Sequence, residues 1–232
     1  MKLQHIGIDS LETWKQFAPP QGGEKQWKDG RSAKELARYI TKSLPDLPEK
    51  LADAIDSFAP GTDNLTWAAE YVTKFPSEEF GRGEGRHHDM VLFNEDVFIG
   101  IEAKADEPFD KALEDWLGSG EGENAPANRH KRADAMCKRI FGDTSEKFKT
   151  IRYQLLSAMT GVLLEAETRK VKKAALIVLT FKKPGSFKPE KARQNDTDFN
   201  EFVERLKLDS TEKCTTCKAD FDVYVRHITI DL

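Results

Sequence analysis

Apolar positions in the first third of the chain recur at helical spacing. Residues 31–42 and 48–58 each place apolar side chains three or four positions apart, and prolines separate the two segments. Residues 64–75 carry a similar stripe, made of Leu65, Ala68, Ala69 and Val72. The pattern predicts three helices, of which the first two form a helical N-terminal extension over residues 1–60.

The pattern then changes to alternation, which is typical of strands. Two apolar segments, 87–93 and 97–105, follow the glycine-rich residues 81–85 and are separated only by the polar residues 94–96. Short polar connections between alternating segments form tight turns. We therefore predict a β-hairpin over residues 87–105.

The remaining pattern predicts an α/β fold. Residues 174–181 form an almost continuous apolar run, which is typical of a strand covered on both faces. Further helices are expected at 108–117, 128–141, 145–168 and 198–208, and a last strand at 221–230. This order favours a mixed β-sheet flanked by helices, in a single domain over 1–232 with its core at 64–232.

Composition and charge narrow the function classes. Hydrophobic residues make up 38% of the chain and the formal net charge is -4, so the chain can bury a core but is no polycation. Residues 129–152 hold eight Lys or Arg against three acids, whereas 95–123 hold ten acids against two Lys. Without a signal peptide or a membrane span in the sequence, we expect a cytoplasmic protein.

The cysteines predict a reducing compartment. Three cysteines are an odd and sparse set for a disulfide framework. Only Cys214 and Cys217 have metal-like spacing, and a structural zinc would require two further ligands. A turn before a strand is the simpler interpretation, and a small zinc protein stays open as an alternative.

Candidate chemistry lies on the predicted hairpin. Alternation places Gly100, Glu102 and Lys104 on one face of the second strand. With a two-residue turn at Glu95 and Asp96, paired positions sum to 191, so Asp89 lies opposite Glu102. Facing carboxylates repel each other unless a cation lies between them. The pattern therefore favours a divalent cation with oxygen ligands, and a surface ion pair between Glu102 and Lys104 is the alternative.

With these residues in place, the chain resembles the PD-(D/E)XK nuclease superfamily, whose fold is restriction-endonuclease-like. The resemblance rests on Asp89, on the return of thirteen residues to Glu102-Ala103-Lys104, and on the order of elements across residues 64–181. Two positions depart from the pattern: His88 stands where proline is usual, and Ala103 is smaller than the usual apolar residue.

The resemblance implies Mg²⁺ or Mn²⁺ held by Asp89, Glu102 and the Ala103 carbonyl, with Lys104 assisting the attacking water. Members of the superfamily often add an acid from the preceding helix, for which Glu70 is the best positional match. A polar residue on the following helix is also frequent, and Gln154 is the candidate here.

Substrate contacts are expected from basic residues near the hairpin. Arg82 and Arg86 suit phosphate binding, and His87 shares the face of Asp89. The predicted basic helices can flank a groove and bind phosphates through seven residues: Arg129, Lys131, Arg132, Lys138, Arg139, Lys147 and Arg152.

Two functions follow from these expectations. The first is a Mg²⁺-dependent nuclease that hydrolyses phosphodiester bonds, in DNA before RNA. The second is a catalytically inactive binding or assembly module with the same fold, which the net negative charge favours. Nucleic acid is the expected partner, no membrane is expected, and a homodimer stays open.

Overall fold

The computed structural model describes residues 3–4, 7–105, 107–119, 125–182 and 189–232. One sheet of six strands, in the order β1-β2-β3-β4-β5-β6, runs through the described chain. Strands β2, β3 and β4 are antiparallel neighbours, whereas β4, β5 and β6 are parallel, and so are β1 and β2. The strands are β1 Leu3–Gln4, β2 Leu65–Thr73, β3 Arg86–Phe93, β4 Val97–Lys104, β5 Lys173–Lys182 and β6 Asp222–Asp231.

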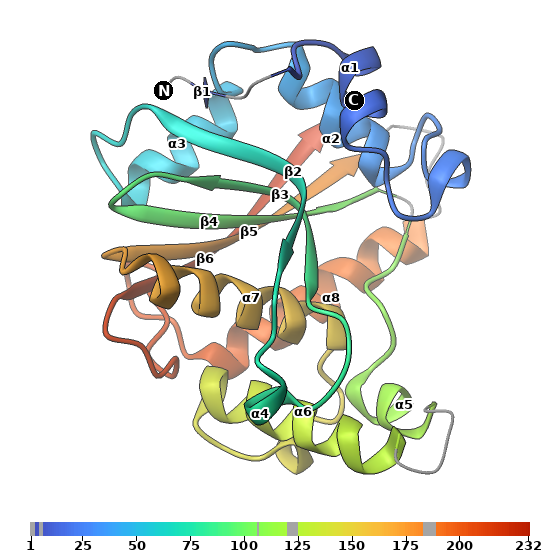
Figure 1. Cartoon of the computed structure of the whole chain (residues 1–232), viewed down its shortest axis with the longest axis vertical. Helices are drawn as coiled ribbons and strands as arrows, with labels where there is room; N and C mark the ends of the chain where they lie inside the picture. Colours follow the sequence, from blue (N-terminus) through green and yellow to red (C-terminus); the bar gives the residue numbers. More distant parts are fainter. Residues whose placement is uncertain (1–2, 5–6, 106, 120–124, 183–188) are drawn as a thin grey trace.

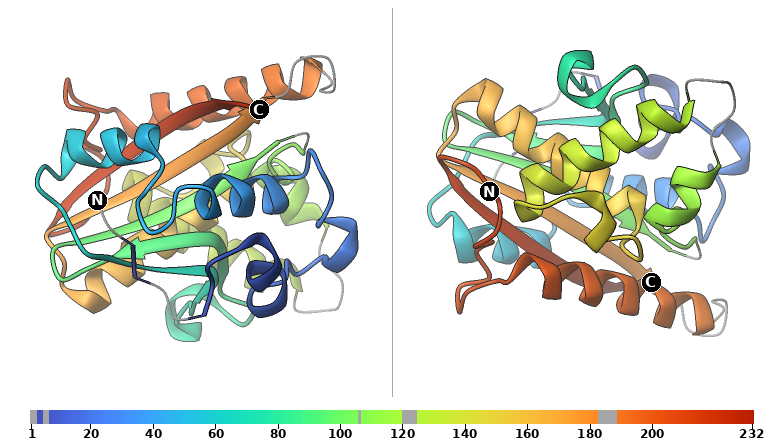
Figure 2. Two further views of the ribbon diagram at one scale, coloured as in Figure 1. Left: turned by 90° about the horizontal axis from the view of Figure 1, so that it is seen from above. Right: turned by 90° about the horizontal axis from the view of Figure 1, so that it is seen from below.

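Helices cover both faces of this mixed sheet (Figures 1 and 2). On one face lie α1 Leu11–Phe17, α2 Ser32–Thr41 and α3 Glu49–Phe58, whose apolar side chains pack with those of β4 and β5. The other face carries α4 Ser77–Phe80, α5 Leu113–Gly118, α6 Ala125–Phe141, α7 Tyr153–Arg169 and α8 Pro189–Leu206. The segment predicted as an N-terminal extension thus supplies one complete layer of the fold. None of the helices in the described ranges has the length and apolar character needed to cross a bilayer.

The predicted helix at 64–75 is wrong, because these residues form β2. Trp67 and Ala69 pack on the side of the N-terminal helices, whereas Ala68 and Tyr71 pack on the side of α7. Alternation breaks at Glu70, whose φ is +50°. A strand that changes face in this way spaces its apolar residues three and four apart, which imitates a helix.

Most other elements lie where the apolar pattern predicts them, with shifted ends. The hairpin, the buried strand and the last strand are confirmed. The helix predicted from residue 145 begins at Tyr153 and follows a short 3₁₀ turn at Ser145–Lys147, and α8 begins at Pro189.

Gly100 of β4 lets the sheet and α7 approach closely. A Cβ at this position would lie 2.6 Å from Val162 Cγ2 of α7 and 3.0 Å from His88 Nδ1 of β3. Val162 and His88 therefore fill the space that a side chain at Gly100 would occupy.

We expect Gly100→Ala to destabilise the fold by about 1–3 kcal/mol, since an added methyl in a filled core forces its neighbours apart. Urea unfolding measures the change. Gly118→Ala is the matched control: beyond its chain neighbours and its own helix backbone, no atom of the described residues lies within 4 Å of the added Cβ, so its stability should stay the same or rise slightly. Equal stability of the two variants would contradict the packing described.

Candidate active site

Strands β2 and β3 bend together at the edge of the sheet, and the bend carries two acids (Figure 1). Glu70 lies between the pairs Ala69↔Met90 and Tyr71↔His88, and Asp89 is the residue between the partners on β3. Met90 packs on the N-terminal side of the sheet, whereas His88 packs against Phe98 and Gly161 on the α7 side. Both strands therefore change face at the two acids.

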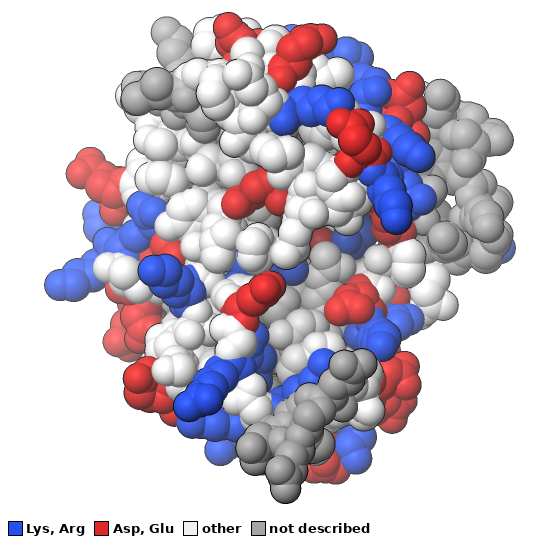
Figure 3. Space-filling model, turned by 45° about the vertical axis from the view of Figure 1, so that its right-hand side comes forward, with Lys and Arg blue, Asp and Glu red and all other residues white. Residues whose placement is uncertain are grey.

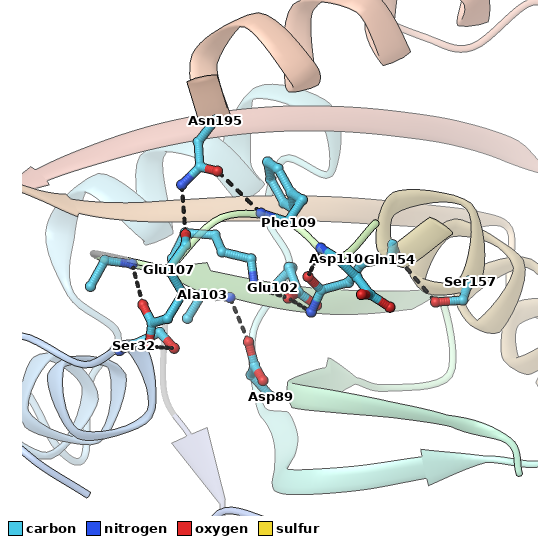
Figure 4. A network of polar contacts seen from close by, with 12 residues as sticks. Ser32, Asp89, Glu102, Ala103, Glu107, Phe109, Asp110, Gln154, Ser157 and Asn195 are labelled. Atoms are coloured by element: carbon cyan, nitrogen blue, oxygen red, sulfur yellow. Dashed lines mark hydrogen bonds and ion pairs between the residues drawn. The ribbon is translucent and has the colours of Figure 1, made fainter. Parts of the chain in front are cut away.

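The predicted hairpin register is confirmed for four pairs, but the ladder ends before the predicted pair of Asp89 and Glu102. The β3–β4 ladder includes Phe93↔Phe98 and Val91↔Gly100, and it extends to Met90↔Ile101. At the next position the Asp89 carboxylate accepts a hydrogen bond from the Ala103 amide, with Oδ2 2.7 Å from the nitrogen. The bend thus brings Asp89 to the strand that carries Glu102, as Figure 4 shows.

The Glu102 side chain is buried, and both of its carboxylate oxygens have hydrogen-bond donors as partners. Its side chain is only 1% exposed, and Oε1 lies 2.8 Å from Lys104 Nζ and 2.5 Å from Gln154 Nε2. The other oxygen, Oε2, accepts a hydrogen bond from Arg86 Nη2. Since the Lys104 side chain is also only 7% exposed, the alternative of a surface ion pair is wrong.

The other two acids of the site, Asp89 and Glu70, have raised pKa values. Burial, together with the neighbouring Glu102 carboxylate, raises the pKa of Asp89 to about 7. Burial, together with Asp89 and Glu102, raises the pKa of Glu70 to about 8. Three carboxylates face only two fixed cations, Arg86 and Lys104. With these pKa values, Glu70 and part of the Asp89 population hold a proton near neutral pH, and a bound cation would displace these protons because it stabilises the ionised carboxylates.

A cleft of about 370 Å³ opens onto these groups. Its walls include Glu70, Asp89 and Lys104 from the sheet and Gln154 from α7. The N-terminal layer supplies the opposite wall, with Pro20, Gln21, Gln26, Ser32 and Ala33. A larger hollow of about 730 Å³ lies against α6, but Arg139 there is paired with Glu79 and Glu167. We therefore assign the candidate site to the smaller cleft.

The loop after β4 is held by residues that the sequence analysis missed. Asn195 of α8 donates to the Glu107 carbonyl and accepts from the Phe109 amide, at 2.9 and 3.2 Å (Figure 4). The Glu107 carboxylate accepts hydrogen bonds from the Ser32 amide and hydroxyl, both at 3.1 Å. These contacts join loop, sheet and helices from distant parts of the sequence, and no local spacing signals them.

The other predicted site residues divide into two groups. Arg86, His87 and Gln154 line the cleft, and Glu70 lines it from a strand instead of the predicted helix. The exposed Arg82 lies on the loop after α4, whose backbone bonds to Asn128, and it is not part of the cleft wall.

Most of the basic residues predicted to bind phosphate bind other parts of the protein. Arg132 donates to the carbonyls of Phe80 and Glu84, and Arg152 pairs with Asp198. Arg129, Arg139 and Lys147 are likewise engaged by protein groups. Lys and Arg side chains alternate with acids on the face drawn in Figure 3.

Within the described ranges, no group of three or more His, Cys, Asp or Glu side chains is arranged to hold a metal ion as it stands. At the cysteine pair considered for zinc, the Cys214 sulfur accepts a hydrogen bond from the Cys217 amide at 3.2 Å. In the cleft, Arg86 and Lys104 contact the Glu102 oxygens that a cation would require. The oxygen-only donor set fits a hard divalent cation once Arg86 leaves Glu102, and the cation would favour the ionised forms of Asp89 and Glu70.

The raised pKa of Asp89 predicts pH-dependent stability. Between the unfolded value of about 3.9 and the folded value of about 7, the folded chain keeps a proton that the unfolded chain has lost. Stability therefore falls as pH rises through this window. Asp89→Asn cannot titrate, so we expect this variant to be more stable than wild type at pH 8, by up to about 4 kcal/mol.

Urea unfolding in EDTA at pH 5 and pH 8 measures the effect. The advantage of Asp89→Asn should shrink at pH 5, where wild-type Asp89 is protonated when folded. If Asp89→Asn were less stable than wild type at pH 8, neighbouring groups would have to stabilise the ionised Asp89 carboxylate in the folded chain, which would contradict the prediction.

Comparison with known proteins gives one match. The family model described as a domain of unknown function, DUF6946, matches residues 7–231. No curated protein and no solved structure matches the chain.

Proposed function

The chain belongs to the DUF6946 family of unknown function, and we propose from the geometry of its cleft that it is a Mg²⁺-dependent nuclease acting on DNA. The observation that carries the proposal is the buried Glu102–Lys104 pair beside Asp89. Asp89 and Lys104 lie in the wall of an open cleft, the buried Glu102 carboxylate lies behind them at 2.8 Å from Lys104 Nζ, and the pKa of Asp89 is raised to about 7. Strongly shifted groups in a cleft are typical of functional sites.

Asp89, Glu102 and the Ala103 carbonyl are the groups that would hold the cation. Mg²⁺, or Mn²⁺ in its place, supplies a Lewis acid and an activated water when bound. Gln154 orients the Glu102 carboxylate through its hydrogen bond. Lys104 provides a fixed positive charge that stabilises negative charge developing on a bound phosphate. Glu70 adds a further carboxylate at the same wall.

One observation favours a second candidate function. Because Arg86, Lys104 and Gln154 already engage both Glu102 oxygens, the site is also consistent with a catalytically inactive binding or assembly module. Calorimetric titration with Mg²⁺ or Mn²⁺ separates the two. Binding that depends on Asp89 and Glu102 supports the nuclease, and no such binding supports the module.

Incubation of the purified chain with single-stranded and duplex DNA tests the nuclease directly. We expect cleavage with Mg²⁺ or Mn²⁺ and none with EDTA. A Glu102→Ala preparation, purified in the same way, controls for contaminating nucleases. Equal cleavage by both preparations would reject the proposal.

A further inference from the structure

Three planar groups form a stack that ends in the wall of the cleft. The rings of Trp116 and Tyr153 are nearly parallel, with an interplanar angle of 10° and a centroid separation of 3.9 Å. On Trp116, the Arg129 guanidinium carbon lies 4.6 Å from the ring centroid. Tyr153 is half-buried and lines the cleft beside Gln154 and Asp110.

Backbone contacts fix the stack in place. The Tyr153 amide donates to the Lys111 carbonyl at 3.0 Å, and the Leu113 amide donates to the Ile151 carbonyl at 2.9 Å. Arg129 also donates to the Trp116 carbonyl and, at 2.8 Å, to the Ser119 hydroxyl. The ring that faces the cleft is therefore held in place before any ligand binds.

We propose that Tyr153 is a stacking platform for an unpaired nucleobase, so that the substrate is single-stranded or locally unpaired DNA. This inference rests on the proposed function. Trp116 covers one face of the half-buried Tyr153 ring, and Tyr153 is the member of this stack that lines the cleft. Among the described residues of the cleft wall, Tyr153 is the only Phe, Tyr or Trp.

The chemistry of the cleft selects a nucleotide. A nucleotide combines an anion with a planar ring, and the cleft wall combines Lys104, Arg86 and acids that would hold a phosphate-binding cation with the Tyr153 ring. In a duplex, bases are already stacked on both faces, so this ring can receive only a base that has left the helix or never belonged to one. A cleft of about 370 Å³ is in the size range of a small ligand.

Fluorescence anisotropy in EDTA measures the binding without cleavage. The probes are a labelled single-stranded DNA oligonucleotide, the same oligonucleotide annealed to its complement, and a single strand that lacks the bases. We expect Tyr153→Leu, which keeps apolar volume without a ring, to weaken single-strand binding about 5- to 150-fold. Tyr153→Phe should keep wild-type affinity, and binding of the base-free strand should not change in either variant.

Phe17→Leu is the control for loss of an aromatic side chain elsewhere, since Phe17 is 61% exposed and is not part of the cleft wall. Thermal melting shows whether Tyr153→Leu is folded, and wild-type affinity of Tyr153→Phe ties the loss to the ring. Unchanged single-strand binding by a folded Tyr153→Leu would overturn the proposal, as would an equal loss with the base-free strand.

This binding measurement, together with the cleavage assay, separates the inference from the proposed function. If cleavage requires a metal ion but Tyr153→Leu binds single-stranded DNA as wild type does, the stacking platform is rejected and the nuclease proposal stands. Tyr153-dependent binding without cleavage under any metal rejects the nuclease and keeps the platform. Absence of both DNA binding and metal-dependent cleavage overturns both.

Discussion

Glu102→Gln is expected to abolish both metal binding and DNA cleavage. The substitution keeps the size of the side chain but removes the charge that Lys104 and Arg86 neutralise in the wild type. Mg²⁺ requires anionic or strongly polar oxygen ligands, and an amide oxygen is a much weaker ligand than a buried carboxylate. Calorimetry with Mn²⁺ and a cleavage assay on single-stranded DNA measure the two losses.

Lys104→Ala is the matched comparison, because Lys104 contacts Glu102 but is not a metal ligand in the proposed site. We expect this variant to keep metal binding while its kcat falls about 10²- to 10³-fold, the magnitude found when a group that stabilises transition-state charge is removed. Equal loss of metal binding in both variants would mean that Lys104 only maintains the position of Glu102. Cleavage that survives Glu102→Gln would remove the carboxylate from the mechanism.

The hairpin and its site could be predicted because both depend on local patterns. The two-residue turn and the alternation fix the register from Phe93 to Met90, which is why the sequence could bring Asp89 close to the strand of Glu102, although β3 changes face at Asp89 itself. Gln154 was a candidate through the resemblance to the nuclease superfamily, and its hydrogen bond to Glu102 joins residues 52 positions apart. The hairpin register, in contrast, requires no knowledge of distant contacts.

Glu70 shows where local patterns fail. The sequence favoured a helix at this residue, because the apolar spacing of a strand that changes face resembles helical spacing. The bend arises from packing on both sides of the sheet, which the sequence of β2 alone does not specify. Glu70 was therefore assigned to the site from its position, while its element and its backbone conformation were predicted wrongly.

Long-range ion pairs account for the other differences. Arg152 and Arg139 were expected at a phosphate-binding groove, but Asp198 and Glu167 bind them. Their partners lie 46 and 28 positions away in the sequence, so no spacing rule connects them. Charge counts along the chain locate basic segments, whereas only the fold shows which of their charges remain available.

Arg86→Gln is expected to strengthen binding of the divalent cation while weakening the fold in its absence. Arg86 donates to the Glu102 oxygen that lies away from Lys104, so arginine and cation compete for one carboxylate. A hydrogen bond between charged groups contributes about 1.5–3 kcal/mol, so removing the competitor should raise Mn²⁺ affinity about 10- to 100-fold. Without metal, loss of a partner from the buried Glu102 should destabilise the fold by up to about 3 kcal/mol.

Calorimetry gives the affinity, and thermal melting with and without Mn²⁺ gives the stability, since a ligand that binds only the folded state stabilises it by RT ln(1 + L/Kd), where L is the free ligand concentration. Arg82→Gln is the matched control: it removes the same charge from an exposed residue outside the cleft wall, so neither quantity should change. Weaker Mn²⁺ binding by Arg86→Gln would show that Arg86 shapes the site. Stronger binding would mean that a cation releases Arg86 from Glu102, and the freed guanidinium is then available at the cleft wall for a phosphate.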